Sequence, residues 1–356
     1  MSDFSAAGFT TAVEVAGVDP LAGEDWDRCV AGHPEAGPFH SSAWARVLAR
    51  TYGHRPCYLR FHRAGLTVAL MPLMDVASRL TGRRGVSLPF ADACDLLLFA
   101  PVSARLILDV LQRLGVERGW RHVELRGSGG VPDSVATSAS FVTHDLDLQQ
   151  GIDALWDGFE PAVQRAVRKA ERDGVTVELR DDRTAMEAFI RLHARTRRRH
   201  GLPPQPDRFF HAILEEIIEP GAGTIALAHQ SGSPVAAAVF FASGARALYK
   251  FGASDERAQS CRANNLAMWH GMRWAIRHGA TSLSFGRTAI EQDGLRRFKC
   301  GWGAAESSLN YFTVTLPEAW WSGPRERRPG LASVVFSHLP LAVNRLLGAA
   351  IYPHLD

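Results

Sequence analysis

Residues 266–286, LAMWHGMRWAIRHGATSLSFG, contain the helix–strand unit on which the predicted fold rests. Apolar residues recur at helical spacing from Leu266 to Ile276, and Gly279 then ends the helix. The residues that follow alternate in hydropathy as a strand and end at Gly286. We therefore predict one helix that leads directly into one strand of a sheet.

The first half of the chain contains the same unit. Apolar residues at 106–114 have helical spacing, Gly119 follows them, and Val123 and Leu125 alternate as a strand. A shift of 160 residues places Gly119 on Gly279. A repeat of this length indicates duplicated domains and not a solenoid, whose periods run at roughly 20–50 residues.

A pair of strands precedes each helix, and each pair turns at a dipeptide that ends in glycine. The predicted strands and turns are Cys57–Arg63 and Leu66–Asp75 about Ala64-Gly65, and Thr224–His229 and Val235–Ser243 about Ser231-Gly232. Strands followed by a helix and a further strand place each half in the α/β class with a mixed sheet. We predict a first domain at 1–150, a second at 151–317, and a linker with an apolar helical tail at 318–356.

The composition is that of an ordinary soluble globular protein. The 356 residues are 46% hydrophobic and 22% charged, which argues against disorder. Five cysteines lie far apart, with no C-x-x-C pair and no histidine cluster at ligand spacing, so we expect neither a disulfide framework nor a metal site. Residues 1–17 lack the basic start and long apolar run of an export signal, so we expect a cytoplasmic protein.

Positive charge is concentrated at the start of the second domain. The net charge of the chain is +3, yet residues 161–200 contain eleven Arg or Lys against six Asp or Glu. Residues 161–173, PAVQRAVRKAERD, are predicted to form a helix with an apolar stripe, which places Arg168 and Lys169 on the opposite face. The segment is either a solvated helix face or a surface that binds phosphates, as in a nucleotide, a lipid diphosphate or tRNA.

Only three of the 40 basic residues are lysines, namely Lys169, Lys250 and Lys299. Because arginine serves wherever a generic positive charge is enough, a retained lysine indicates a place for a compact ammonium group. Lys299 lies in the glycine-bounded segment GLRRFKCGWG, residues 294–303. There it would stabilise the oxyanion that develops when an amine attacks an ester. The alternative is that Lys299 simply pairs with Glu291 or Asp293.

Two further segments hold candidate binding residues. The segment 192–206, LHARTRRRHGLPPQP, has three consecutive arginines that cannot share one helix face. Such a cluster suits bidentate recognition of phosphate or carboxylate, and a solvated helix end is the alternative. The segment 87–95, SLPFADACD, places Asp92 after a proline-fixed loop. Asp92 would bind a substrate amine, act as a base or cap the next turn.

Several of these segments resemble one known family, the Fem-type aminoacyltransferases that form peptidoglycan bridges. The segments similar to its C-terminal region are YKFGAS at 249–254, the helix start Asn264-Asn265-Leu266, SFGRT at 284–288 and GLRRFKCGWG at 294–303. RAVRKAERDGV at 165–175 and TRRRHGLPPQP at 196–206 resemble the second domain, especially in members known as lipid II:glycine glycyltransferases. SLPFADAC at 87–94 and YGHRPCYL at 52–59 resemble the first domain, so the likeness covers roughly residues 40–315.

That resemblance implies an α/β fold of two tandem GNAT-like (acyl-CoA N-acyltransferase-like) domains with mixed sheets. It further implies transfer of an aminoacyl group from charged tRNA to an amine of a cell-wall precursor. Lys299 beside Phe298 would stabilise the transferring acyl centre, and we add Asp92 to the predicted catalytic residues. The predicted substrate-binding residues, some of them for the precursor's phosphates, are Arg168, Lys169, Arg197, Arg198, His200, Gln205, Tyr249, Lys250, Asn264, Asn265 and Arg287. The chain has no segment for the long coiled-coil arm that some members insert in the second domain.

Aminoacyl-tRNA is the predicted donor, and no cofactor is expected. The runner-up is an N-acyltransferase that uses acetyl-CoA or another acyl-CoA. A glycine-rich turn usually takes the CoA pyrophosphate in such enzymes, whereas residues 254–266 here, SDERAQSCRANNL, contain no glycine. A third hypothesis is a non-catalytic partner in polysaccharide export. The acceptor is a peptidoglycan precursor, an exopolysaccharide precursor or a small-molecule amine of the antibiotic type.

The tail after Pro317 differs from the body of the chain. Residues 319–330, AWWSGPRERRPG, are predicted to be a linker, and residues 334–351 are apolar with Arg345 as their only charge. Pro340 and Arg345 interrupt this apolar run, so a transmembrane span is not expected. We predict a helix packed on the body, and the alternative is peripheral contact with the inner face of a membrane.

Overall fold

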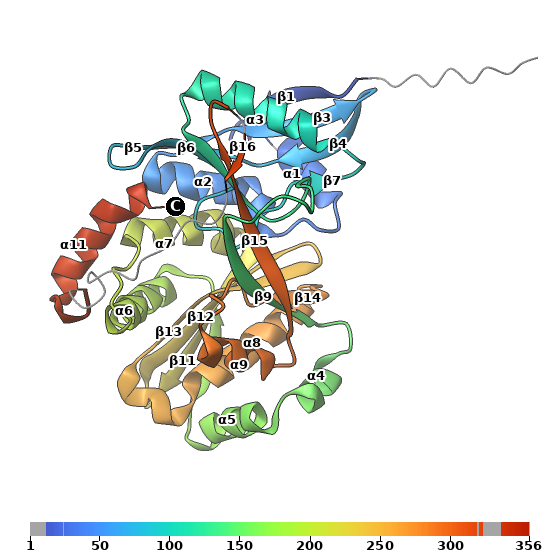
Figure 1. Ribbon diagram of the computed structural model, residues 1–356. Helices are drawn as coiled ribbons and strands as arrows, with labels where there is room; N and C mark the ends of the chain where they lie inside the picture. The colour runs from blue at the N-terminus through green and yellow to red at the C-terminus, as the bar shows by residue number, and fades with distance from the viewer. Residues whose placement is uncertain (1–11, 24, 319, 323–335, 356) are drawn as a thin grey trace, which may run out of the picture.

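The computed structural model describes residues 12–23, 25–318, 320–322 and 336–355 (Figure 1). Its helices are α1 (Asp25–Ala31), α2 (Ser42–Tyr52), α3 (Ala104–Arg118), α4 (Ile152–Gly158), α5 (Pro161–Arg172), α6 (Arg183–Arg199), α7 (Asp207–Ile213), α8 (Ala263–Arg277), α9 (Asp293–Cys300) and α11 (Leu341–Ile351). Short 3-10 helices and one π-helix are labelled η1 (Pro38–His40), η2 (Leu214–Ala222, the π-helix), η3 (Glu256–Cys261) and η4 (Tyr352–His354). The strands are β1 (Glu14–Val18), β2 (Arg55–Pro56), β3 (Tyr58–Arg63), β4 (Leu66–Met71), β5 (Met74–Ser78), β6 (Gly82–Val86), β7 (Leu97–Leu98), β8 (His122–Arg126), β9 (Ala139–Asp147), β10 (Thr176–Arg180), β11 (Gly223–Gln230), β12 (Ser233–Ser243), β13 (Arg246–Ser254), β14 (Ser282–Ser284), β15 (Ala305–Thr315) and β16 (Trp320–Ser322).

One mixed sheet of twelve strands runs through both halves, in the order β10-β11-β12-β13-β14-β9-β15-β8-β6-β5-β2, with β16 beside β15. A smaller sheet, β1-β3-β4-β7, belongs to the first half. In the large sheet β13 is parallel to β14 and β6 is parallel to β8. Helix α8 joins the first of these parallel pairs and α3 lies between the strands of the second, so the predicted repeat is confirmed.

Glycines end both repeated helices in the left-handed region. Gly119 follows α3 with φ 66°, and Gly279 follows α8 with φ 79°. The two predicted hairpin turns also have positive φ at both central residues, as at Ser231 and Gly232, where φ is 50° and 75°. The strands flanking these turns pair antiparallel as predicted.

The two halves of the sheet exchange one strand each. Strand β9, which precedes residue 150, pairs with β14 of the second half, and β15 pairs with β8 of the first half. The exchanged strands also pair with each other, from Ala305 opposite Asp145 to Tyr311 opposite Ala139. Figure 1 shows them crossing the middle of the molecule. The predicted boundary near residue 150 assigns β9 to the first domain. In the sheet, however, β9 lies beside β14, a strand of the second half.

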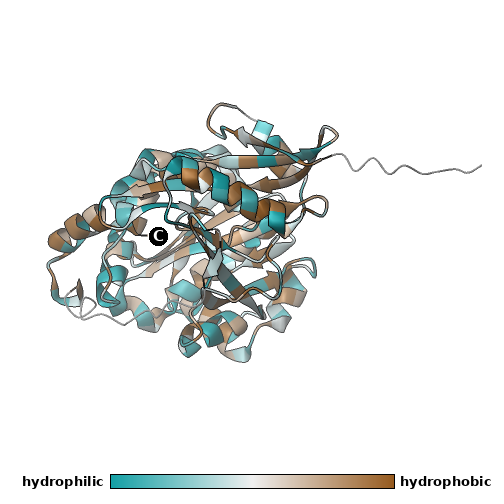
Figure 2. Ribbon diagram, turned by 45° about the horizontal axis from the view of Figure 1, so that its top comes forward, coloured by the Kyte–Doolittle hydropathy of each residue, from teal (hydrophilic) through white to brown (hydrophobic). Residues whose placement is uncertain are grey.

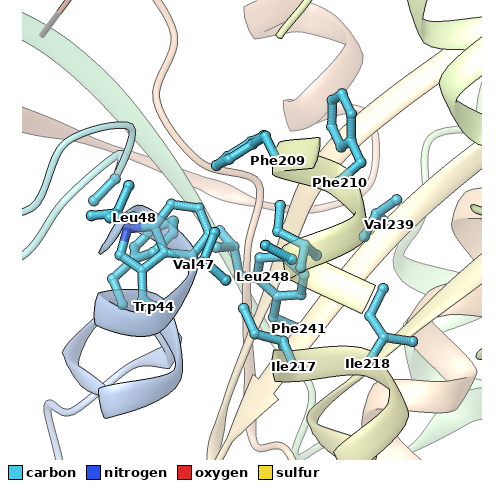
Figure 3. Packing of buried hydrophobic residues seen from close by; sticks show 14 of the residues in the cluster. Trp44, Val47, Leu48, Phe209, Phe210, Ile217, Ile218, Val239, Phe241 and Leu248 are labelled. Carbon is cyan, nitrogen blue, oxygen red and sulfur yellow. The ribbon is translucent and has the colours of Figure 1, made fainter. Parts of the chain in front are cut away.

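A hydrophobic cluster holds the two halves together (Figure 3). Trp44 of α2 packs edge-on against Phe209 of α7, with ring centroids 5.9 Å apart, and lies 6.3 Å from the ring of Phe241 on β12. All three side chains are at most 1% exposed. Burying large aromatic rings contributes strongly to stability, so this cluster fixes how the halves sit against each other.

The helices outside this cluster follow the predicted patterns. Helix α5 spans Pro161–Arg172 and buries Val163, Val167 and Ala170, the expected apolar stripe. The tail forms α11, which lies against α6 as predicted. Most of the predicted linker lies outside the described residues, apart from β16. None of the described helices is both long enough and apolar enough to cross a bilayer.

Candidate functional site

A cavity of about 260 Å³ lies between the two halves, with walls from η1, the loop after Phe90, and strands β9, β13, β14 and β15. The strand exchange brings these elements together. The lining carboxylates are Glu35, Asp92, Asp95 and Asp145, and the lining arginine is Arg246. Arg246 is already paired with Glu35 at 2.5 Å. The remaining charge of the lining favours a cationic ligand such as an amine.

Lys299 of α9 is buried behind the wall of this cavity. Its side chain is 3% exposed, and Nζ donates to Gly286 O at 2.8 Å and to Thr288 Oγ1 at 2.7 Å. Gly286 itself lines the cavity. An ammonium group has three N–H donors, so one remains for a ligand oxygen. Among the described residues no ion pair joins Lys299 to Glu291 or Asp293, the alternative that the sequence left open.

The environment of Lys299 disfavours its charged form. Burial lowers the pKa of Lys299 to about 8, and the neighbouring Lys250 acts in the same direction. The carboxylates of Asp92 and Asp145 oppose this shift without cancelling it. A lysine whose pKa lies near neutrality inside a cleft wall is typical of functional sites.

Lys250 of β13 fixes the position of Asp92. Its Nζ donates to Phe90 O at 2.7 Å and to Asp92 Oδ2 at 3.0 Å, and it lies 4.8 Å from the ring centroid of Phe39. The side chain of Lys250 is 6% exposed, while that of Asp92 is 24% exposed and lines the cavity. Lys250 therefore positions Asp92 in the cavity wall, where its carboxylate can bind an amine.

Helix α9 also borders a second, more open depression, which we call the basic groove. It consists of two hollows of about 720 and 480 Å³ that share Arg262, Asn265 and Phe298. Its basic lining residues are Arg165, Lys169, Arg199, His200, Arg262 and Arg297. Lys169 pairs with Asp173, but no ion pair neutralises the four arginines among the described residues. Unpaired arginines along one groove favour a ligand that carries several phosphates.

Several predicted substrate-binding residues lie in the basic groove. His200, Tyr249, Asn264 and Asn265 line its smaller hollow beside Phe298. Burial lowers the pKa of His200, and Arg199 adds to that effect. Burial also raises the pKa of Tyr249 to about 12. Both side chains therefore stay neutral at pH 7 and offer hydrogen bonds rather than charge.

The arginine cluster at the end of α6 does not form a single phosphate clamp. Arg197 donates to Tyr352 Oη at 2.8 Å and to Pro203 O at 3.3 Å, which anchors the C-terminal tail. Arg198 is exposed and lines neither the cavity nor the groove. Gln205 makes a hydrogen bond of 2.9 Å with the buried His193.

Two further predicted residues are engaged with aromatic rings. Arg287 lies 4.5 Å from the ring centroid of Phe141 and donates to Tyr311 Oη at 2.9 Å. Arg168 lies 5.3 Å from the ring centroid of Trp156 on α4. Neither lines the cavity or the basic groove, so both support the local structure.

His144, Cys300 and Glu306 bring their potential metal-ligating atoms within 4.8 Å of one another. Positive groups already surround them: Arg296 forms two hydrogen bonds with Glu306, at 2.8 and 2.7 Å, and the charge of Lys299 lowers the pKa of His144 in addition to burial. A divalent cation would be repelled by these two side chains. The cluster fits a network of ion pairs better than a metal site.

Asp145, Arg262 and Arg297 are not among the site residues predicted from the sequence. Asp145 carried one signal, since it is a carboxylate inside the alternating strand β9. Arg262 has φ 58° and directly precedes α8, a conformation that non-glycine residues seldom adopt and that the sequence alone does not reveal. Arg297 lies in the segment 294–303 that was considered for Lys299, and it lines the larger hollow of the groove.

Comparison with known proteins bears on the fold. Residues 160–306 match the family described as acetyltransferase (GNAT) domain. A crystal structure of FemX aligns with a TM-score of 0.65 at 15% identity, covering 86% of this chain and 98% of that one. A tandem GNAT protein from the clavulanic acid biosynthesis pathway aligns with a TM-score of 0.55 at 13% identity, covering 85% and 98%. The structure of L-PGS from Bacillus licheniformis aligns with a TM-score of 0.51 at 13% identity, covering 86% and 92%.

No curated protein matches the sequence. At such low identities the structural matches define the fold, and the predicted pair of GNAT-like domains is confirmed. The domain match and the fold together support an acyltransferase. Residues 160–306 are therefore similar to a GNAT acetyltransferase domain, and the chain shares its fold with FemX and with a tandem GNAT protein.

Proposed function

We propose that the protein moves an aminoacyl group from charged tRNA to an amine held in the cavity between the two halves, forming an amide bond. The observation that carries this proposal is the position of α9. Its Phe298 lines the basic groove, and its next residue, Lys299, contacts Gly286 in the wall of the acidic cavity. The ammonium thus lies between a surface suited to a polyanionic donor and a cavity suited to an amine.

The proposed reaction needs no nucleophile from the enzyme. The acceptor amine attacks the ester carbon of the donor, the C–N bond forms, and the tRNA ribose oxygen leaves with a proton. Lys299 would donate its third N–H to the developing oxyanion. Asp92, held by Lys250, would orient the attacking amine. The acceptor itself is a cell-wall precursor, an exopolysaccharide precursor or a small amine.

An acyl-CoA donor is the second candidate, because the smaller hollow of the groove lies at the start of α8. Helix N-termini bind phosphate well, and Arg262, Asn264 and Asn265 line this hollow. A glycine-rich turn before α8 would let a pyrophosphate approach the backbone. In this chain the short helix η3 and Arg262 occupy that position. The side chains of η3 and Arg262 obstruct a pyrophosphate, which favours the tRNA donor.

The charge of the groove can be tested with the double variant Arg262→Glu and Arg297→Glu. We expect its dissociation constant for total charged tRNA to rise at least tenfold, and the slope of log affinity against log salt to fall by about 2. Binding is measured by fluorescence anisotropy with labelled tRNA and, in parallel, by calorimetry with acetyl-CoA. Arg55→Glu is the control, because Arg55 is also exposed and lies on β2 at the opposite end of the sheet. Unchanged tRNA affinity together with lost acetyl-CoA binding would assign the donor as acyl-CoA.

The pH dependence of transfer follows from the pKa of Lys299. Its ammonium form predominates below about pH 8 and is lost above it. We expect kcat/KM to fall as pH rises through about 8, since the oxyanion then loses its charged donor. Steady-state assays between pH 6 and 10 measure this fall in kcat/KM, and circular dichroism at each pH monitors the fold. A rate that keeps rising to pH 10 would remove Lys299 from the chemistry.

A further inference from the structure

Helix α11 is amphipathic, but it packs its polar side on the body and exposes its apolar side. The residues that it turns toward the body are polar or small: Asn344 is fully buried, Arg345 pairs with Asp207, and Gly348 packs on the backbone of Pro204. The residues on its outer face are Ala342, Val343, Leu346, Leu347 and Ala350, all of them exposed. A surface helix of a globular protein normally buries its apolar stripe and exposes its polar one. Here polar contacts dock the helix and present leucines to the outside.

The apolar surface continues beyond the helix. His354 of η4 contacts Ser78 and Thr81, which flank the turn between β5 and β6. Leu80 in that turn is 75% exposed, and Leu355 after η4 is 42% exposed. We call Val343, Leu346, Leu347, Leu355 and Leu80 the C-terminal apolar face. In Figure 2 α11 is coloured mainly as hydrophobic and lies at the edge of the molecule.

Positive charge accompanies this face. Arg79 is exposed in the same turn as Leu80. Exposed leucines with an arginine beside them are typical of surfaces that lie in the interface of a bilayer containing anionic lipids.

We propose that the C-terminal apolar face inserts into the headgroup region of an anionic membrane and holds the enzyme there as a peripheral protein. A second copy of the chain is a poorer fit. The face consists of five exposed apolar side chains, whereas a stable interface between proteins takes about 20 residues or more from each partner. The exposed apolar residues of α11 lie on the outer side of one helix, which suits shallow insertion between lipids.

The test is co-sedimentation of the full chain with vesicles of phosphatidylglycerol and phosphatidylcholine, compared with vesicles of phosphatidylcholine alone. We expect the wild-type protein to bind the anionic vesicles and to be released by high salt. The double variant Leu346→Glu and Leu347→Glu should lose binding at least tenfold, because two carboxylates would have to enter the interface.

Leu66→Glu is the matched control, since Leu66 is 73% exposed, as Leu346 is at 72%, and lies at the hairpin of β3 and β4 in the first half. It should bind vesicles like the wild type. Thermal unfolding of all three proteins shows whether they are folded. Failure of the wild type to bind anionic vesicles, or equal binding by the double variant, would overturn the proposal. So would a wild-type dimer, measured by light scattering, that the double variant converts to a monomer.

Discussion

Replacing Lys299 by Met is expected to lower the rate of acyl transfer by about 100- to 1000-fold, the usual cost of removing one donor to an oxyanion. The methionine fills nearly the same volume but offers no N–H and no charge. Its neighbours Gly286 and Thr288 lose a hydrogen bond each, but Gly286 still lines the cavity. The readout is single-turnover transfer from charged tRNA to the acceptor, with donor binding measured separately.

The same substitution should not destabilise the fold at neutral pH. The pKa of Lys299 is about 8 in the folded protein, below its usual 10.5, so between these values the unfolded chain holds a proton that the folded chain has released. Wild-type stability therefore rises with pH across this window, by up to about 3 kcal/mol, and is lowest below pH 8. Lys299→Met lacks this dependence, so its free energy of unfolding at pH 7 should equal or exceed that of the wild type.

Urea denaturation at pH 7 and pH 9.5 measures both quantities. Lys169→Met is the matched control, because Lys169 is a half-exposed lysine paired with Asp173 on the surface and should shift stability by less than about 1 kcal/mol. A Lys299→Met protein that is clearly less stable at pH 7 would make Lys299 a structural residue. Full retention of the transfer rate would separate Lys299 from the reaction.

The repeated helix–strand units could be predicted because their signals are local. Glycines after each helix and in each hairpin turn occupy positive φ positions, which the sequence shows directly. The strand exchange could not be predicted in this way. Strand β9 carries an alternating pattern that fits either half, whereas β15 buries consecutive residues, and their partners lie up to about 190 residues away in the chain. Only the packing of the complete sheet selects β14 for β9 and β8 for β15.

The site was predicted less completely, for the same reason. Arginines that cluster in the sequence were predicted to bind phosphate. Arg197, however, donates a hydrogen bond to Tyr352, 155 residues further along the chain. Conversely, Arg262 and Arg165 are far apart in sequence and become neighbours of one groove only through the packing of α5 on α8. The importance of a lone lysine was easier to predict, because lysine is rare in this chain and each remaining one can be considered separately.

Replacing Lys250 by Met is expected to lower the free energy of unfolding by about 3 kcal/mol, since it removes one partner from a largely buried ion pair. Lys250 lies on β13 of the second half, while Phe90 O and Asp92, its acceptors, belong to a loop of the first half. Without the ammonium, Asp92 loses its ion-pair partner, and the rings of Phe39 and Trp44 lose a cation–π partner.

A double-mutant cycle isolates that cost. If the unpaired charge of Asp92 causes the destabilisation, adding Asp92→Asn to Lys250→Met should restore part of the lost stability, with a coupling energy of about 1–3 kcal/mol measured by urea denaturation. The transfer assay then separates the two roles of the pair: Lys250→Met should raise KM for the acceptor because Asp92 is no longer held, whereas donor affinity should not change. A Lys250→Met protein as stable as the wild type, with an unaltered KM, would mean that Asp92 is positioned by its own loop and not by the second half of the molecule.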